Sequence, residues 1–265
     1  MRIMLRGPRL ARIAVGIIVG LMCPTVVRAN DGAGAATAEI LVAYSRAGGG
    51  RPGAGDAERL SIDGSGGFEL RRTVGGARIG HFAGTVPATK QRSLRTAVAS
   101  LRSSFSSSER VAPGSVTERI ATARFTFDSS YDGGISASWT RVLTQVRSLT
   151  ESLVSSPVAG LELSVTSAGL RAELRHIGTK PVDIAGDSVV VTAALANADD
   201  VITGRWRTEI RLPSQSAARG WRVDLGLERS GLRLSRGQHL IVSAGLDIVG
   251  DDGVRRPASM TVTAA

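Results

Sequence analysis

The chain has 265 residues and a formal net charge of +10, from 33 basic and 23 acidic side chains. Its single cysteine, Cys23, excludes a disulfide framework, and no cysteine remains in the mature region expected below to act as a nucleophile or metal ligand. Aromatic residues make up 4% of the chain, too few for a base-stacking platform, which argues against a nucleic-acid partner.

The first 29 residues have the three-part pattern of a secretory signal peptide. Basic residues from Arg2 to Arg12 precede an apolar stretch, and Val27-Arg28-Ala29 predicts cleavage between Ala29 and Asn30. The apolar stretch contains glycine and proline and is shorter than the roughly twenty residues of a membrane span. We therefore expect an exported protein (periplasmic, in the cell envelope or extracellular) with no transmembrane segment after cleavage.

Two alternatives to cleavage are an uncleaved anchor and lipidation at Cys23, although bacterial lipidation requires a small residue where Met22 stands. Cleavage would lower the formal charge from +10 to +5, because the first 29 residues contain five arginines and no acid. A mildly cationic mature chain favours acidic surfaces without requiring nucleic acid.

The region from residue 38 to residue 155 follows a small, polar segment, 30–37, that predicts a flexible spacer. Strands are expected at 39–44, 59–63, 68–73, 78–82, 123–129 and 134–140. One helix is expected after Thr85 as N-cap, with Pro87 in its first turn, and a second over 140–154. This order predicts an α+β domain over 38–155, an antiparallel sheet with both helices on one face.

After Pro157 the pattern changes to short segments in which apolar and polar residues alternate. Seven such segments with turn residues between them predict an all-β, immunoglobulin-like sandwich over residues 158–265. No segment of this half has a helical period.

The glycines at 48, 50 and 53 have the G-x-G-x-x-G spacing of a nucleotide-binding turn. That turn requires a helix beginning at its last glycine, because the helix N-terminus binds the phosphates. The residues after Gly55 are strand-like, and the loop contains no lysine. We therefore interpret it as a connection between two strands and expect no cofactor.

Residues that could form a catalytic or metal centre are scattered. His81, His176 and His239 show no ligand spacing, and no G-x-S-x-G elbow is present. Four acidic residues, Asp63, Asp132, Asp251 and Asp252, lie beside glycines at predicted turns, where Asx hydrogen bonding explains them, although Asp251-Asp252 could contribute to a calcium site. We expect a protein without enzymatic activity; a hydrolase whose Ser, His and Asp meet only in the fold is the alternative.

Arginines gather on one predicted strand. Arg205, Arg207 and Arg211 share a face with Glu209, and arginines at 171, 219, 222, 255 and 256 could add to it. The simpler interpretation is the solvated face of an outer strand, with arginine stems covering apolar surface. The alternative is an envelope-associated module that binds an anionic polymer through this face.

The order of elements in residues 38–155 resembles the bacterial emfourin-like module. The resemblance rests on "ILVAYSRAGGG", "RLSIDGSGGFELRR", "LRTAVASLRSSF" and "ARFTFDSSYDGGISASWT" in succession. The family is known for a small, single-domain inhibitor of thermolysin-type metalloproteases without a signal peptide, so this chain differs in its signal and in the appended sandwich. Together with the export expected from the signal peptide, the resemblance implies a protein-binding protein that is an inhibitor or partner of a secreted metallopeptidase.

Partner contacts usually lie on loops held by a rigid scaffold. On that basis the loop expected between Tyr44 and Gly55 is the candidate contact segment. Its candidate partner-binding residues are Tyr44, Ser45, Arg46, Gly48, Gly49 and Arg51.

Overall fold

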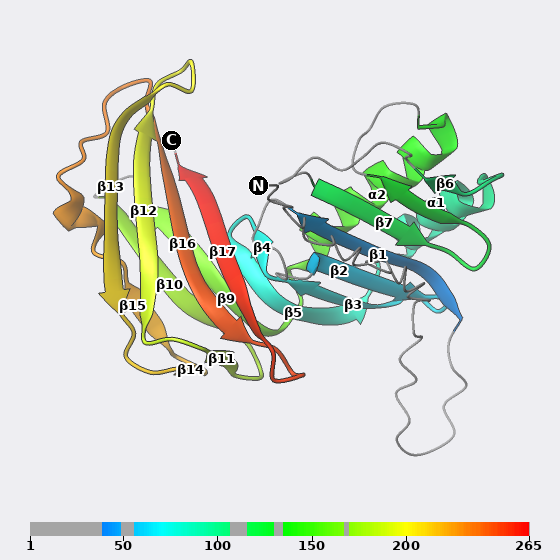
Figure 1. Ribbon diagram of the computed structural model, residues 1–265, viewed down its shortest axis with the longest axis horizontal. Coiled ribbons are helices and arrows are strands. Elements are labelled where there is room, and N and C mark those ends of the chain that lie inside the picture. Colours follow the sequence, from blue (N-terminus) through cyan, green and yellow to red (C-terminus); the bar gives the residue numbers. More distant parts are fainter. Residues whose placement is uncertain (1–38, 49–55, 107–115, 130–134, 167–169, 265) are drawn as a thin grey trace, which may run out of the picture. The chain divides into compact units, whose positions relative to one another are not determined.

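The computed structural model describes residues 39–48, 56–106, 116–129, 135–166 and 170–264, which form one compact unit (Figure 1). The expected signal peptide, its cleavage site at Ala29 and Asn30, and the spacer at 30–37 lie outside the described residues. The described chain is mostly β-structure with two α-helices.

The elements follow in this order: β1 (Ile40–Gly48), β2 (Asp56–Asp63), β3 (Gly67–Arg72), β4 (Val74–Gly75), β5 (Arg78–Thr85), α1 (Ala88–Ala99), β6 (Phe105–Ser106), β7 (Val116–Ala121), β8 (Thr126–Ser129), α2 (Ala137–Leu153), β9 (Pro157–Thr166), β10 (Arg171–Gly178), β11 (Val182–Ile184), β12 (Ser188–Ala196), β13 (Ile202–Arg211), β14 (Ser216–Ala217), β15 (Arg222–Asp224), the 3-10 helix η1 (Leu227–Ser230), β16 (His239–Val249) and β17 (Arg255–Ala264).

The strands form two sheets. Sheet A has ten strands in the order β15-β10-β9-β5-β3-β2-β1-β7-β8-β6, antiparallel except for the pair β6 and β8. Sheet B has the order β13-β12-β16-β11-β14, and β17 joins it by pairing with β16 and, in parallel, with β4. Sheet A therefore continues from β5 into β9, across the boundary expected between residues 155 and 158.

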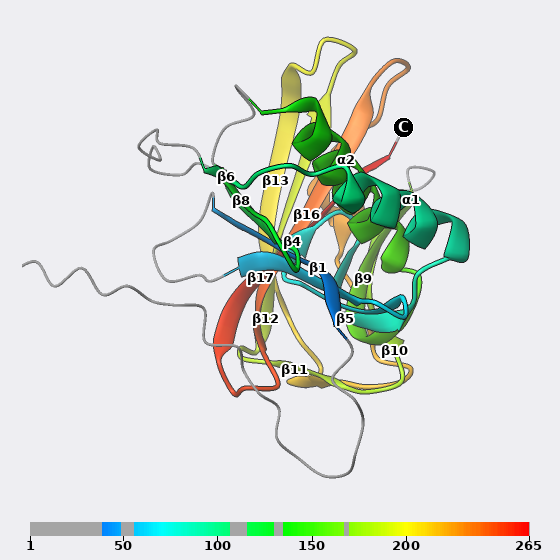
Figure 2. The same ribbon diagram turned by 90° about the vertical axis from the view of Figure 1, so that its right-hand side faces the viewer.

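The first hydrophobic core lies between sheet A and the two helices, which lie on the same side of β1, β2 and β3 (Figures 1 and 2). Strand alternation supplies one side of it: in β3, Phe68, Leu70 and Arg72 are buried while the residues between them are more exposed. Helix α2 supplies the other side with Trp139, Val142, Leu143, Val146, Leu149, Thr150 and Leu153. Helix α1 adds Leu94 and Ala97.

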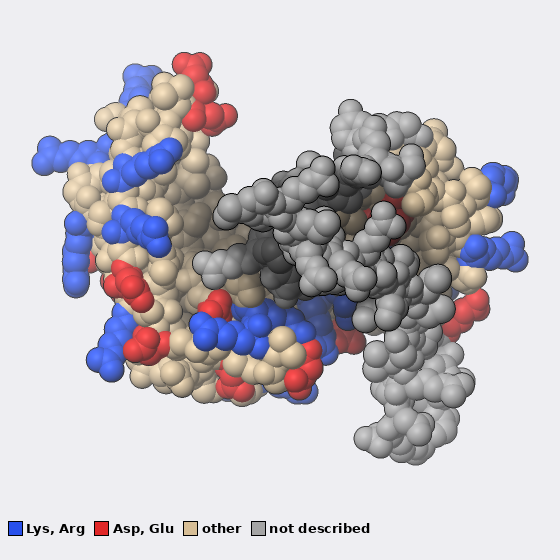
Figure 3. All heavy atoms as spheres, in the orientation of Figure 1, with Lys and Arg blue, Asp and Glu red and all other residues tan. Residues whose placement is uncertain are grey.

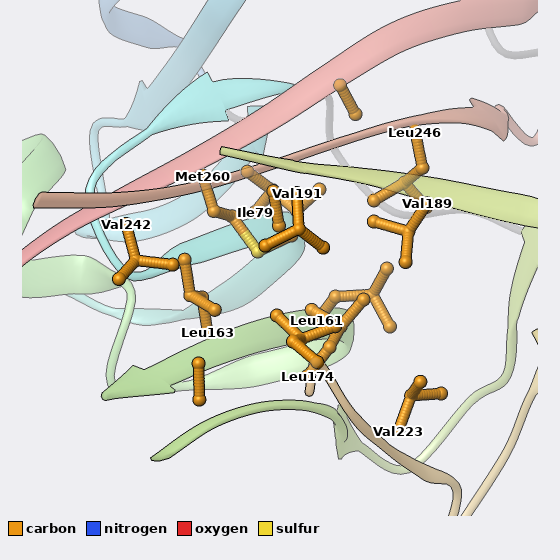
Figure 4. Close-up of a cluster of buried hydrophobic side chains, with 14 of the residues drawn as sticks. Ile79, Leu161, Leu163, Leu174, Val189, Val191, Val223, Val242, Leu246 and Met260 are labelled. Atoms are coloured by element: carbon orange, nitrogen blue, oxygen red, sulfur yellow. The ribbon is translucent and has the colours of Figure 1, made fainter. Parts of the chain in front are cut away.

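The second core lies between sheet B and the β5, β9 and β10 part of sheet A (Figure 4). Leu161, Leu163 and Leu174 come from sheet A and meet Val191 and Met260 from sheet B. The eleven-residue strand β16 alternates strictly between half-buried and buried residues, as a strand with one face on a core must.

Each face of sheet A packs against a hydrophobic core, but the two cores cover different strands. Ile79 is opposite Leu161 in register and belongs to the second core, so sheet B covers this face at β5 and β9. His81 is opposite Arg71 on the same face, where β3, β2, β1 and β7 continue the sheet. Over those four strands this face is turned away from the helices, and we call it the open face.

Several expected elements were wrong. Residues 134–140 were expected to form a strand, but helix α2 begins at Ala137, with Ser136 as N-cap accepting from the backbone N–H of Trp139. Thr85 ends β5, and the N-cap of α1 is Pro87, with no side-chain cap. The short helix η1 interrupts the half expected to be entirely β. Residues 130–133, between the strands expected at 123–129 and 134–140, lie outside the described residues.

Candidate functional site

Strand β1 carries four of the six residues proposed from the sequence to contact a partner. It runs to Gly48, so residues 44–48 of the segment expected to be an exposed loop are strand, and residues 49–55 lie outside the described residues. Tyr44 is 2% exposed and belongs to the first core, which corrects its expected position on a contact surface. Arg46 is exposed and follows Tyr44 on the helix side, while Ser45 lies on the open face. Gly49 and Arg51 lie outside the described residues.

On the helix side, residues of alternating charge cross four strands. Arg46 is paired in register with Glu118 of β7 and with Glu58 of β2, and Glu58 is opposite Arg72 of β3. Helix α2 adds one charge at each end: its residues Arg147 and Glu151, one turn apart, bind Glu118 and Arg72 respectively. We call these six residues the charge row; it contains three arginines and three glutamates and is formally neutral.

Hydrogen bonds and ion pairs connect the charge row to the core. Tyr44 donates its hydroxyl to Glu118 Oε1 at 2.7 Å, and Arg147 Nε donates to the same oxygen at 3.0 Å. Arg72 Nη1 donates to Glu151 Oε2 at 3.3 Å. The contact between Arg72 Nε and Glu58 Oε1 is 3.0 Å long but lacks the alignment of a hydrogen bond. Each carboxylate therefore already has a guanidinium partner, so the row fastens α2 to the sheet.

The two buried carboxylates of the row have opposite pKa shifts. Burial raises the pKa of Glu58, and the nearby Arg72 offsets only part of this. Burial also acts to raise the pKa of Glu118, but the hydrogen bonds from Arg147 and Tyr44 outweigh it, and the pKa is lowered. Burial, together with the Glu118 carboxylate, raises the pKa of the Tyr44 hydroxyl.

The open face carries a second row, formed by five residues in register on five adjacent strands. Ser45 of β1 is opposite Arg119 of β7 on one side and Arg59 of β2 on the other. Arg59 is opposite Arg71 of β3, and Arg71 is opposite His81 of β5. We call Arg119, Ser45, Arg59, Arg71 and His81 the open-face row.

Acidic residues lie at the two ends of the open-face row. Arg119 Nε is 3.0 Å from Asp128 Oδ2 at one end. At the other end Glu69 Oε1 is 2.9 Å from Arg71 Nη2 and 3.4 Å from His81 Nε2. Asp251, in the turn between β16 and β17, also contacts Arg71 at 3.0 Å.

The arginine face predicted on β13 has the expected alternation. Arg205, Arg207, Glu209 and Arg211 are exposed, and the residues between them are half-buried. The additional arginines suggested from the sequence lie elsewhere: Arg171 and Arg222 are in sheet A, and Arg255 and Arg256 bind Asp247 and Asp252.

Sequence reasoning missed a second set of arginines beside β13. The segment 226–238 runs along this strand in the opposite direction (Figure 1). Its Leu232 reaches Gly204, where an added Cβ would lie 3.1 Å from Cδ2, and Gln238 Nε2 donates to Thr203 Oγ1 at 3.0 Å. Arg229, Arg233 and Arg236 of this segment are exposed. The signal that could have found them is the alternation of Leu232 and Leu234 with arginine.

Within the described part of the chain, no histidine forms a hydrogen bond with a serine side chain. His176 Nε2 is 2.7 Å from the carbonyl oxygen of Lys180, and His239 Nε2 is 3.3 Å from Asp200 Oδ1. The described residues also contain no group of three or more His, Cys, Asp or Glu placed to hold a metal ion. Asp252, considered above for calcium, is engaged by Arg256 at 2.8 Å.

Among the residues that the structure describes, no helix combines the length and apolarity needed to cross a membrane. No protein-family model matches this chain, and no curated protein matches it in sequence.

Proposed function

We propose that this protein is an exported, non-enzymatic binding protein that docks a partner protein on the open face of sheet A. The open-face row is the observation that carries this proposal. Sheet strands lie about 4.8 Å apart, so a row on five strands extends over about 19 Å.

The chemistry of the row favours a partner that presents hydrogen-bond acceptors. Arginine donates through a planar fork that fits carboxylates, and the Ser45 hydroxyl can also donate. The neighbours of Ser45 on this face are small: Ala43 and Ser61 form the adjacent pair in register. A flat surface with donors lets a partner's backbone carbonyls and acidic side chains approach closely.

The specific partner we propose is a secreted thermolysin-type metallopeptidase. The resemblance of residues 38–155 to emfourin-like modules supports this choice. We propose in the same terms that these residues form an α+β layer of that kind and that residues 158–265 form an immunoglobulin-like sandwich. The position of α1 and α2 on one side of β1, β2 and β3 supports the first part of this assignment.

The test is a titration of a thermolysin-type metallopeptidase with the purified protein, measuring peptide hydrolysis. We expect the protein to inhibit hydrolysis at micromolar concentration or below. Arg59→Ala combined with Arg119→Ala removes the two guanidinium groups beside Ser45 and is expected to weaken inhibition by about 2- to 30-fold, since each exposed charged contact contributes about 0.2–1 kcal/mol.

Arg205→Ala combined with Arg207→Ala is the matched control, because it removes two exposed arginines from a different sheet. We expect this variant to inhibit as the unmodified protein does. Unchanged hydrolysis at micromolar excess of protein would overturn the metallopeptidase proposal. Equal inhibition by all variants would overturn the assignment of the contact to the open face.

A further inference from the structure

We propose that the outer side of β13 and the segment beside it bind a linear anionic polymer, at a site separate from the open face. The site consists of six exposed arginines that we call the arginine edge: Arg205, Arg207, Arg211, Arg229, Arg233 and Arg236. Figure 3 shows basic side chains over this part of sheet B.

Two segments that are separate in the sequence supply the arginine edge. On β13 the alternate residues Trp206 and Ile210 pack against the second core, which turns the arginines away from it. In the adjacent segment Leu232 and Leu234 pack against the same core, and Arg233 between them is exposed. In both segments apolar residues that face the core alternate with arginines, so both sets of arginines lie on the outside.

The charges of the arginine edge are unbalanced. Glu209 and Glu228 are the acidic residues within its two segments, and Glu228 is 3.4 Å from Arg229 Nε. Glu209 accepts a hydrogen bond from Ser188. Within the described chain the arginines at 205, 207, 211, 233 and 236 form no ion pair. Arginines without acidic partners on one surface create a positive potential that attracts anions.

The spacing of these arginines favours a polymer over a single anion. Residues two apart in a strand are about 7 Å apart, so Arg205 and Arg207 suit successive charged groups, and Arg211 lies about 20 Å from Arg205. One phosphate cannot contact both ends, whereas a chain with repeated phosphate or carboxylate groups can. Guanidinium groups bind either group through two parallel hydrogen bonds.

The residues of the arginine edge argue against a nucleic-acid ligand. Single-stranded nucleic acid is bound by aromatic side chains on which bases stack, in addition to basic groups. The exposed residues of β13 between Thr203 and Arg211 include no aromatic side chain, and Trp206 faces the second core. Attraction between charges, without base stacking, therefore determines what binds.

The experiment measures binding of long-chain polyphosphate by the full protein, with polyglutamate, orthophosphate and single-stranded DNA as comparison ligands. We expect both polymers to bind at low ionic strength, with affinity falling steeply as salt is added. Polyphosphate binding without polyglutamate binding would identify phosphate as the recognised group, and the reverse would identify carboxylate. Orthophosphate at the same total phosphate concentration is expected not to compete.

Two variants locate the site. Arg205→Ala, Arg207→Ala and Arg211→Ala together are expected to weaken polymer binding by about tenfold or more, because three exposed charged contacts are lost. Arg233→Ala with Arg236→Ala tests the second segment and is expected to weaken it severalfold. Arg255→Ala with Arg256→Ala is the matched control, because these arginines are already paired with Asp247 and Asp252; it is expected to bind as the unmodified protein does.

Absence of polymer binding at low salt would overturn the proposal, as would equal loss of binding in the control variant. Tighter binding of single-stranded DNA than of polyphosphate with the same number of charges would overturn the exclusion of nucleic acid. Competition by orthophosphate would replace the polymer site with a single-anion site. None of these results bears on the open face, because Arg59 and Arg119 are unchanged in every variant.

Discussion

Glu58 and Glu118 lie in the same packed layer, but their pKa values are shifted in opposite directions. Both are less than 10% exposed, and both are opposite Arg46 in register. Glu118 accepts aligned hydrogen bonds from Arg147 and Tyr44, which stabilise its charged form. The arginine close to Glu58 is poorly aligned for a hydrogen bond, so burial determines the direction in which the pKa of Glu58 is shifted. Alignment of donors therefore decides the direction of each pKa shift.

Replacing each of these carboxylates by a neutral amide should change the free energy of unfolding differently at pH 7. Glu118→Gln removes the negative charge that accepts three hydrogen bonds, one from Tyr44 and two from Arg147, and we expect the free energy of unfolding to fall by about 1.5–3 kcal/mol. Glu58→Gln resembles the protonated form that burial favours, so we expect stability equal to or above that of the unmodified protein. Chemical denaturation of both variants measures this. A larger loss of unfolding free energy for Glu58→Gln than for Glu118→Gln would contradict the conclusion that Glu118, and not Glu58, is stabilised as a charged group.

The same residues predict how stability depends on pH. The pKa of Glu118 is lower in the folded than in the unfolded state, so its stabilisation is present above about pH 4.3 and is lost as the pH falls through the folded pKa. The pKa of Glu58 is raised, so its contribution is present below about pH 4.3 and is lost as the pH rises through the folded pKa.

The expected result is a stability difference between the unmodified protein and Glu118→Gln that is largest near neutral pH and shrinks below about pH 4. Denaturation curves recorded at a series of pH values measure this difference. A difference that stays constant down to pH 2 would mean that Glu118 is not stabilised as a charged group.

At the scale of elements, the junction of β5 and β9 determines whether sheet A continues. Gly80 and Gly160 are opposite each other there, and Gly80 has a φ of +126°. A Cβ on Gly80 would lie 2.2 Å from the carbonyl oxygen of Ala159, which is backbone and cannot move aside. A glycine is therefore required for both the conformation and the close approach of the two strands.

Gly80→Ala should therefore disrupt the pairing of β5 with β9. We expect a loss of about 2–4 kcal/mol in the free energy of unfolding, from backbone strain and steric overlap together. Gly76→Ala is the matched control, because nothing lies within 4 Å of its added Cβ, and its effect should stay within about 0.5 kcal/mol. Similar stability of the two variants would contradict the junction described here.

Elements were predictable where one residue pattern dominated, and not where two patterns competed. The alternation of β13 fixed its exposed arginines from sequence alone. The start of α2 was missed because the residues around Ser136 alternate like a strand, while the N-cap acts through a single hydrogen bond. The charge row and open-face row were not predictable, because each depends on strand register and β7 was not recognised as a strand.

At the scale of the whole molecule, two hydrophobic cores share one sheet. The first core lies on the helix side of sheet A and the second on the opposite face, and Ile79 of β5 belongs to the second. Unfolding either core would expose sheet A and break hydrogen bonds that support the other. The described chain should therefore unfold as one unit, even though the sequence pattern changes at Pro157.

Differential scanning calorimetry measures this coupling. We expect one heat-absorption peak whose calorimetric enthalpy equals the van't Hoff enthalpy, as for a two-state transition. In the Gly80→Ala variant, which weakens the junction, the peak should broaden or split. Two separate transitions in the unmodified protein would show that the cores are energetically independent.

The measurement that tests the central claim most directly is the affinity of Ser45→Trp for a thermolysin-type metallopeptidase, compared with the unmodified protein by titration calorimetry. Ser45 lies at the centre of the open-face row, so an indole there would hold a docked partner away from the arginines on both sides. We predict at least about a hundredfold loss of affinity with an unchanged melting temperature, since a blocked contact removes about 3 kcal/mol or more. Equal affinity of the variant and the unmodified protein would contradict the open face as the binding surface.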